Sequence, residues 1–291
     1  MTDFSAFRYL YVLFKPIIIS NQTHLAMEKA GNIRKMRTEL ADPVRYFLPV
    51  GGEEIFLNEL IGSELRMEFL GEIHCIRCGR KTSKSFAQGY CFPCFKTAPE
   101  TEECVLHPEM CRAHEGIARD MTYAAKHCLS DQVVYLSYTS GLKVGVTRIS
   151  QVPYRWIDQG AVGAVEIARA PNRFTAGLIE VFLKDHMADK TNWRNMLKHV
   201  LLVAGDLLER KREVLRLLPV DLAAYGSHND AVTTIGYPVD AYPVKIGSLN
   251  LDKDPQIRGV LSGIKGQYLL FSNGKVINIR KFSGYRVRLE Y

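Results

Sequence analysis

Residues 133–148 read VVYLSYTSGLKVGVTR, and this stretch decides the fold of the central segment. Two runs rich in β-branched and aromatic residues flank a turn at Ser140-Gly141, and apolar and polar residues alternate in them. Alternation with period two on both sides of a glycine-containing turn is typical of a β-hairpin. The hairpin directly follows the segment that contains all seven cysteines of the chain.

After the hairpin, the sequence pattern switches between helical and extended periodicity. The predicted elements are a short helix over residues 151–160, a strand over 161–170, a helix over 172–190 and one or two further helices over 192–218. The order β-β-α-β-α-α predicts a compact α/β module over residues 131–215.

Glu180 lies on the apolar stripe of the predicted helix over residues 172–190, at helical spacing from Ala176 and Leu183. An unpaired carboxylate on a buried face is costly. Glu180 therefore needs a partner, which is either the cation of an ion pair, from Lys184 or Arg155, or a metal ion.

The segment over residues 132–197 resembles the GIY-YIG nuclease superfamily. In that superfamily a hairpin carries the two name motifs and is followed by a helix with an arginine, a strand, and a helix with a glutamate. Here VVY, which ends at Tyr135, lies at the position of the first motif. The residues KVG, which end at Gly145, lie at the position of the second motif.

The two helix motifs also match in order and spacing. Arg155 follows the second motif by ten residues, and AGLIE resembles the Ala-x-x-x-Glu that introduces the metal-binding glutamate, which gives Glu180. Lys143 replaces the tyrosine of the second motif, and Val133 replaces the leading glycine of the first. Lysine occurs at this place in a divergent branch with the pattern Lys-Ile-Gly-x-Thr, to which Thr147 conforms.

The resemblance implies hydrolysis of phosphodiester bonds. Glu180 would hold Mg²⁺ or Mn²⁺ together with waters and a phosphate oxygen. Arg155 would form a fork to the phosphate and stabilise developing charge. Tyr135 would activate or orient the attacking water, and Lys143 would contact phosphate as a point charge in place of the missing tyrosine.

The first four cysteines form two Cys-x-x-Cys motifs separated by twelve residues, CIRC and CFPC. Each motif aims two thiolates at one metal, and two motifs supply the four soft ligands of a tetrahedral structural Zn²⁺. A redox dithiol is the alternative, but it does not need two paired motifs. The sequence predicts one structural zinc bound by Cys75, Cys78, Cys91 and Cys94.

A second zinc site is predicted in the next stretch, CVLHPEMCRAH, which offers three ligands. Either His127 or Cys128 would supply the fourth. We assign this site to Cys104, Cys111, His114 and Cys128. The alternative is that these cysteines are free and packed as small hydrophobic residues.

Both ends of the chain show short strand patterns, with turn signals at Gly51-Gly52 and Asn273-Gly274. The second of these is typical of a type I′ hairpin. We expect both ends to pair into one small barrel-like sheet. The fold class is then α+β, with a β-rich N-terminal region (1–72), a Cys-rich zinc-binding segment (73–130), the central module (131–215) and a basic β-rich C-terminal region (216–291).

The formal net charge is +7, and residues 241–291 contain nine Lys or Arg against three Asp or Glu. Excess positive charge favours a polyanionic partner such as DNA or RNA. The alternatives are a solvated basic surface and, at the C-terminus, an ordinary half-buried sheet. The candidate nucleic-acid contacts are Arg77, Arg80, Lys81, Arg280, Lys281 and Arg286.

Hydrophobic residues make up 47% of the chain and charged residues 24%, as in ordinary globular proteins. The apolar stretch over residues 7–20 is interrupted by Lys15 and Pro16 and is too short to span a membrane, so we interpret it as a strand-forming extension. We expect a cytoplasmic protein without a membrane partner, because no convincing secretion signal is present.

The leading hypothesis is a zinc-stabilised, metal-dependent endonuclease of GIY-YIG type. Two other classes remain open: a nucleic-acid-binding protein that keeps the module as a scaffold, and a protein-interaction module built on the zinc segment. The whole arrangement also resembles a bacterial family of uncharacterised function, in which a zinc segment precedes such a module.

Overall fold

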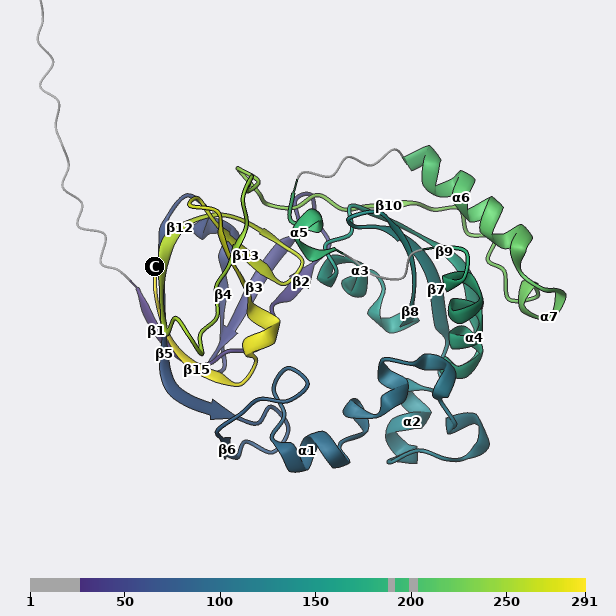
Figure 1. Cartoon of the computed structure of the whole chain (residues 1–291), viewed down its shortest axis with the longest axis horizontal. Helices are drawn as coiled ribbons and strands as arrows, with labels where there is room; N and C mark the ends of the chain where they lie inside the picture. The colour runs from purple at the N-terminus through teal and green to yellow at the C-terminus, as the bar shows by residue number, and fades with distance from the viewer. Residues whose placement is uncertain (1–26, 188–191, 199–203) are drawn as a thin grey trace, which may run out of the picture.

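The computed structural model of the protein describes residues 27–187, 192–198 and 204–291. Within these ranges the strands form three sheets, of eight, four and three strands, joined by short helices (Figure 1). The fold is of the mixed α+β class, as the sequence predicts. No helix in the same ranges is long and apolar enough to span a bilayer. The predicted extension over residues 7–20 lies outside the described residues.

The largest sheet joins the two ends of the described chain. Its strands in spatial order are β1 (Glu28–Asn32), β15 (Tyr285–Glu290), β5 (Glu64–His74), β12 (Gln256–Lys265), β13 (Tyr268–Phe271), β14 (Lys275–Asn278) and β11 (Gly247–Ser248), with β6 (Lys81–Thr82) beside β5. β15 lies between β1 and β5 and is antiparallel to both. The prediction that the N-terminal and C-terminal segments share one sheet is therefore confirmed.

The turn between β13 and β14 differs from the predicted type I′ turn. Its loop has three residues, and the N–H of Gly274 donates to the carbonyl oxygen of Phe271 at 2.9 Å. Gly274 has a φ of +77°, whereas Asn273 is not left-handed. A type I′ turn needs positive φ at both central residues, so this loop is instead a type I turn closed by a left-handed glycine.

A second, three-stranded sheet packs against the large one. Its strands are β2 (Arg37–Glu39), β3 (Arg45–Val50) and β4 (Glu53–Phe56), and a 3₁₀ turn over Leu57–Leu60 follows. Apolar side chains of both sheets form one core, which also includes Tyr135, Trp156 and Ile157 of the central segment. The terminal regions and the central module thus share a continuous core.

Three strands of the central segment and one strand of the C-terminal region form the four-stranded sheet, in the order β10 (Thr233–Thr234), β9 (Gly163–Ala170), β7 (Gln132–Tyr138) and β8 (Leu142–Arg148). The helices of the central segment are α3 (Tyr154–Asp158), α4 (Arg173–Lys184), α5 (Trp193–Met196) and α6 (Ala204–Leu217), and α7 (Val220–Ala223) follows in the C-terminal region. The β7–β8 hairpin and the succession β-β-α-β-α follow the predicted order.

Both faces of this central sheet are covered. Val134 and Leu136 pack with Ile179 of α4 and Leu207 of α6 on one face, on the right of Figure 1. Successive side chains of a strand point to opposite faces, and Tyr135 accordingly joins the core shared with the terminal sheets. The apolar run in β7 is continuous because both faces are buried.

The Cys-rich segment connects β5 of the large sheet to β7 of the central sheet, along the bottom of Figure 1. It contains two short helices, α1 (Phe92–Thr97) and α2 (Met121–His127), and four 3₁₀ turns, η2 (Pro99–Thr101), η3 (Glu103–Val105), η4 (Pro108–Met110) and η5 (Ala113–Glu115). With so little regular structure, its conformation depends on the cysteine clusters and on packing against α4.

Candidate metal centres and catalytic site

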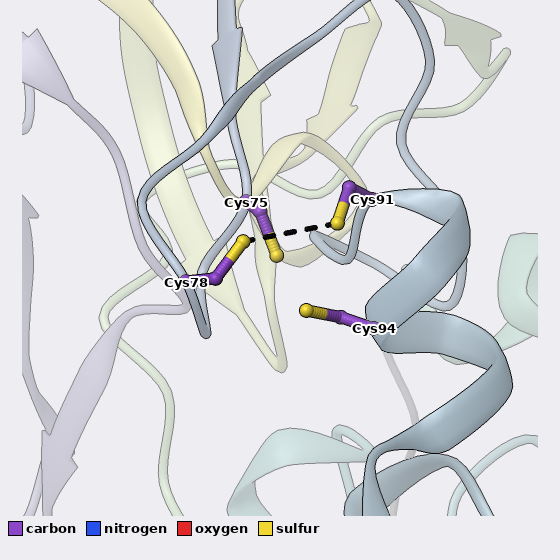
Figure 2. Close-up of side chains that lie close together, drawn as sticks. All are labelled: Cys75, Cys78, Cys91 and Cys94. Carbon is purple, nitrogen blue, oxygen red and sulfur yellow. Dashed lines mark hydrogen bonds between the residues drawn. The ribbon is translucent and has the colours of Figure 1, made fainter.

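The four cysteines of the two Cys-x-x-Cys motifs converge, as predicted. The sulfur atoms of Cys75, Cys78, Cys91 and Cys94 all lie within 4.8 Å of one another. Figure 2 shows the four side chains pointing toward a common centre, two from the loop after β5 and two from the start of α1. This set offers four soft ligands and fits a tetrahedral Zn²⁺.

The local backbone explains how the cysteines are aimed. The N–H of Gly79 donates to the carbonyl oxygen of Cys75 at 2.9 Å, and Gly79 has a φ of +70°, which favours glycine. Cys91 caps the N-terminus of α1, so that Cys94 lies in its first turn on the same side. The loop and the helix thus present one pair of thiols each.

The electrostatic environment of the thiols differs within this cluster. Burial acts to raise the pKa of Cys75, but backbone N–H groups of Cys78, Cys91 and Arg77 donate to its sulfur and bring the pKa down to about 6. Burial and hydrogen bonds with the other thiols raise the pKa of Cys94 to about 12. A metal ion that binds all four sulfurs as thiolates would remove this disparity, because coordination deprotonates thiols.

The second cluster contains three cysteines rather than the four predicted ligands. The sulfur atoms of Cys104, Cys111 and Cys128 lie within 4.8 Å of one another, and all three residues are buried. Hydrogen bonds shared with Cys104 and Cys128 lower the pKa of Cys111. A pocket of about 480 Å³ borders the three cysteines, which leaves room for a further ligand from outside the cluster.

Neither candidate histidine belongs to this second group. The ring of His114 stacks on Phe174 at 4.3 Å between centroids. His127 stacks on Tyr123, and its Nδ1 lies 2.9 Å from the carbonyl oxygen of Tyr123. Of the predicted set, the structure brings together the cysteines and leaves His114 outside.

Tyr135 and Gly145 face each other across the hairpin. They are register partners in β7 and β8, and the Tyr135 side chain is buried. Its hydroxyl accepts a hydrogen bond of 2.7 Å from Nε2 of Gln159, after α3. Any side chain at position 145 would collide with the Tyr135 ring. Lys143 lies two residues before Gly145 in β8 and is the register partner of Ser137 in β7. Its side chain therefore lies on the same face of the hairpin as position 145.

Arg155 and Glu180 both lie within electrostatic range of Tyr135. Burial raises the pKa of Tyr135, the positive charge of Arg155 lowers it, and the negative charge of Glu180 raises it. Three elements, β7, α3 and α4, therefore bring Tyr135, Arg155 and Glu180 close together.

Glu180 itself is 9% exposed. Burial raises its pKa, and the positive charges of Lys184 and Arg155 oppose this effect. Lys184, one turn along α4, forms an ion pair with it at 3.5 Å. The ion-pair partner considered from the sequence is thus in place, beside the residues of the candidate catalytic site.

Glu109 is a member of this site that the sequence did not indicate. Its backbone packs directly on Gly177 of α4, where a Cβ would come within 2.2 Å of the Glu109 nitrogen. Gly177 lies one turn before Glu180, and the negative charge of Glu109 raises the pKa of Glu180. One Glu109 oxygen, Oε2, is buried without a hydrogen-bond partner.

Several of the candidate nucleic-acid contacts form ion pairs with acidic side chains. Arg286 and Lys81 both pair with Glu72, at 2.9 Å and 2.8 Å, and hold its pKa at about 2. Arg77 pairs with Glu100. Arg80 is exposed, and the Lys281 ammonium lies over the Phe282 ring at 5.3 Å. The C-terminal charge is therefore partly neutralised.

The fold and these sites define an α+β protein with two cysteine clusters suited to metal ions. The chain belongs to the DUF2797 family, described as proteins of unknown function, whose family model matches residues 62–287. That range covers both cysteine clusters and the central module. No curated protein and no solved structure matches the chain. Membership of an uncharacterised family is thus confirmed, while the resemblance to the GIY-YIG superfamily stays a prediction.

Proposed function

We propose that this protein is a divalent-metal-dependent nuclease of GIY-YIG type, in which the cysteine clusters hold structural zinc. The observation that carries the proposal is the convergence of Tyr135, Arg155 and Glu180 from a hairpin, a short helix and a longer helix. The GIY-YIG module has its functional residues on the same succession of elements.

The carboxylates of the site suit a hard cation. Glu180 is buried, and Glu109 has a buried oxygen without a hydrogen-bond partner beside it. Carboxylate oxygens are the ligands that Mg²⁺ and Mn²⁺ prefer in proteins, so Glu180, aided by Glu109, would hold such an ion. When bound, the ion supplies Lewis-acid stabilisation of charge on the phosphate.

The other residues have roles that follow from their protonation and exposure. The raised pKa of Tyr135 keeps its phenol protonated at neutral pH, so Tyr135 would orient a water rather than act as a tyrosinate base. Arg155 is exposed and can form a fork to a phosphate. Lys143, on the same face of the hairpin, would add a further positive charge.

The second cysteine cluster supports the catalytic site directly under this proposal. The turn η4, which carries Glu109, lies between Cys104 and Cys111 in the chain and packs against α4. A metal ion bound by the three cysteines would fix this turn and hold the Glu109 carboxylate beside Glu180. Zinc would then be structural, and its loss would disturb the carboxylate pair.

A second candidate function is nucleic-acid binding without cleavage. The ion pair between Glu180 and Lys184 favours it, because this pair already gives the buried carboxylate a partner. The replacements at Lys143 and Val133, relative to the superfamily pattern, point the same way.

Cleavage assays separate the two functions. Purified protein is incubated with plasmid DNA and with structured RNA, with Mg²⁺ or Mn²⁺. We expect cleavage that falls about 10²-fold or more in Glu180→Ala and Arg155→Ala. Glu213→Ala is the matched control, since Glu213 is a helical glutamate ion-paired to Arg210 away from the site. Binding without cleavage under all these conditions would replace the nuclease with the scaffold function.

A further inference from the structure

Two arginines from distant parts of the chain lie within electrostatic range of each other, and one of them, Arg155, belongs to the candidate catalytic site. Arg155 lies on α3 of the central module, and Arg280 lies on the 3₁₀ turn η7 (Ile279–Phe282) of the large sheet. Arg155 is exposed and Arg280 is half-buried. A basic residue of the C-terminal region thus lies beside a residue of the central module.

A chain of hydrogen bonds fixes this approach. The N–H of Ile279, next to Arg280, donates to the backbone carbonyl of Gln267 at 2.9 Å. The side chain of Gln267 donates to Asp158 at 2.9 Å. Asp158 lies three residues after Arg155 on α3, and residues at this spacing share a helix face. The turn η7 and the Arg155 face of α3 are therefore held together.

Asp158, the acid that acts on Arg280, already has other partners. Asp158 forms an ion pair with Lys35 as well as the hydrogen bond from Gln267. Among the residues that the structure describes, neither Arg155 nor Arg280 forms an ion pair with an acid. Two other arginines of the C-terminal region differ in this respect: Arg258 pairs with Glu64 of β5, and Arg286 pairs with Glu72 of β5.

The positive charge of each guanidinium group also acts on the other group. Burial lowers the pKa of Arg280, and the positive charge of Arg155 lowers it further, whereas the negative charge of Asp158 and the Tyr90 side chain act in the opposite direction. Two like charges at this distance repel each other, and the positive charge of Arg280 is also costly because that side chain is half-buried. A bound anion that accepts from both groups relieves this repulsion.

We propose that Arg155 and Arg280 together bind one phosphate group of a nucleic-acid backbone. Two guanidinium groups from different elements can donate to several oxygens of one phosphate. A phosphate therefore fits this pair better than a single carboxylate would. The inference rests on the proposed function for the identity of the ligand, and it adds a substrate-binding residue from outside the central module. The large sheet thereby helps to hold the strand that the module would cut.

Equilibrium binding tests this site without any need for cleavage. A fluorescein-labelled DNA duplex and an RNA duplex of the same sequence are titrated by anisotropy without added Mg²⁺ or Mn²⁺. Arg280→Ala should weaken binding about tenfold or more, as expected for a charged hydrogen bond. The matched control Arg258→Ala, whose arginine is paired with Glu64, should change affinity about twofold or less. Equal effects of the two variants would overturn the proposal.

The double variant tests whether one phosphate is shared. The double variant Arg155→Ala/Arg280→Ala should lose an amount of affinity that differs from the product of the two single losses, because both groups contact the same ligand. Independent losses would show two separate contacts and overturn the shared site. An RNA or DNA preference would identify which polymer supplies the phosphate.

Thermal unfolding with inorganic phosphate provides a readout that does not depend on nucleic acid. Phosphate at constant ionic strength should raise the Tm of the wild type relative to chloride, since a ligand of the native state stabilises it. The increase should vanish in Arg280→Ala and persist in Arg258→Ala. If phosphate has no such effect, the anion site fails; if the effect is present but no nuclease activity is found, only the proposed function fails.

Discussion

The hydroxyl of Tyr135 lies directly over Gly145, its register partner across the β7–β8 hairpin. A Cβ on residue 145 would come within 2.6 Å of that hydroxyl and 2.7 Å of the ring carbon that bears it. The glycine therefore allows a buried tyrosine to lie flat across the hairpin and to present its hydroxyl to Gln159.

Gly145→Ala should destabilise the protein by about 1–3 kcal/mol, because an added methyl group must displace a fully buried ring. Urea unfolding followed by tryptophan fluorescence measures the change, since Trp156 packs edge-on against Tyr135 at 5.8 Å. Gly141→Ala in the hairpin turn is the control, because its Cβ would meet nothing within 4 Å. Equal effects of the two substitutions would contradict the packing described for Tyr135.

The Cys75→Ser/Cys91→Ser double variant should lose one zinc per chain. It removes one ligand from each Cys-x-x-Cys motif, and two thiols alone hold zinc poorly. Metal content by mass spectrometry of the purified protein gives the number, and the variant should also melt at lower temperature, because bound structural zinc contributes to folding. Unchanged zinc content would rule out this cluster as the site.

The second cluster should lose its metal in Cys128→Ser but keep it in His114→Ala. All three cysteines converge, whereas the His114 ring is stacked on Phe174. The zinc content of the two variants distinguishes a three-cysteine centre from the four-ligand set with His114. Metal loss in both variants would show that His114 is a ligand after all.

Glu180→Gln should gain stability over the wild type as pH rises, in the absence of added divalent ions. Burial raises the pKa of Glu180 above its ordinary value of 4.5. The native state therefore holds this proton more tightly than the unfolded chain, and the stability linked to it is present below 4.5 and lost as pH rises through the folded pKa. The Tm difference between the two proteins, followed by circular dichroism, should widen upward from about pH 4.5 and then level off. A difference that stays constant with pH would show that the Lys184 ion pair cancels the cost of burial.

The hairpin, the helix that carries Glu180 and the four-cysteine cluster could be predicted from the sequence because each depends on local pattern. Alternation in VVYLSY and LKVGVT fixes β7 and β8, and two Cys-x-x-Cys spacings fix the first metal centre. Register within the hairpin also follows from its short loop, which places Tyr135 opposite Gly145.

Contacts between distant segments could not be predicted in the same way. The approach of Glu109 to Glu180 depends on η4 packing onto Gly177, and a glycine inside a helix pattern was the only local sign of it. The pairing of Arg286 with Glu72 arises from the register of β15 on β5, which a single sequence does not reveal. The net charge of the C-terminal region alone therefore suggests more unpaired basic side chains than the folded protein presents.

The position of β15 between β1 and β5 sets an order of events during synthesis. Both neighbours leave the ribosome long before residues 285–290, so their facing edges must wait unpaired for the last strand. Unpaired edges are prone to associate with other chains, and pairing across such a long sequence separation is slow. The first cysteine cluster, by contrast, is complete once Cys94 has emerged. A nascent chain can therefore complete this metal-binding cluster first and close its largest sheet last. Chaperone dependence or aggregation should be greatest for chains that end just before β15.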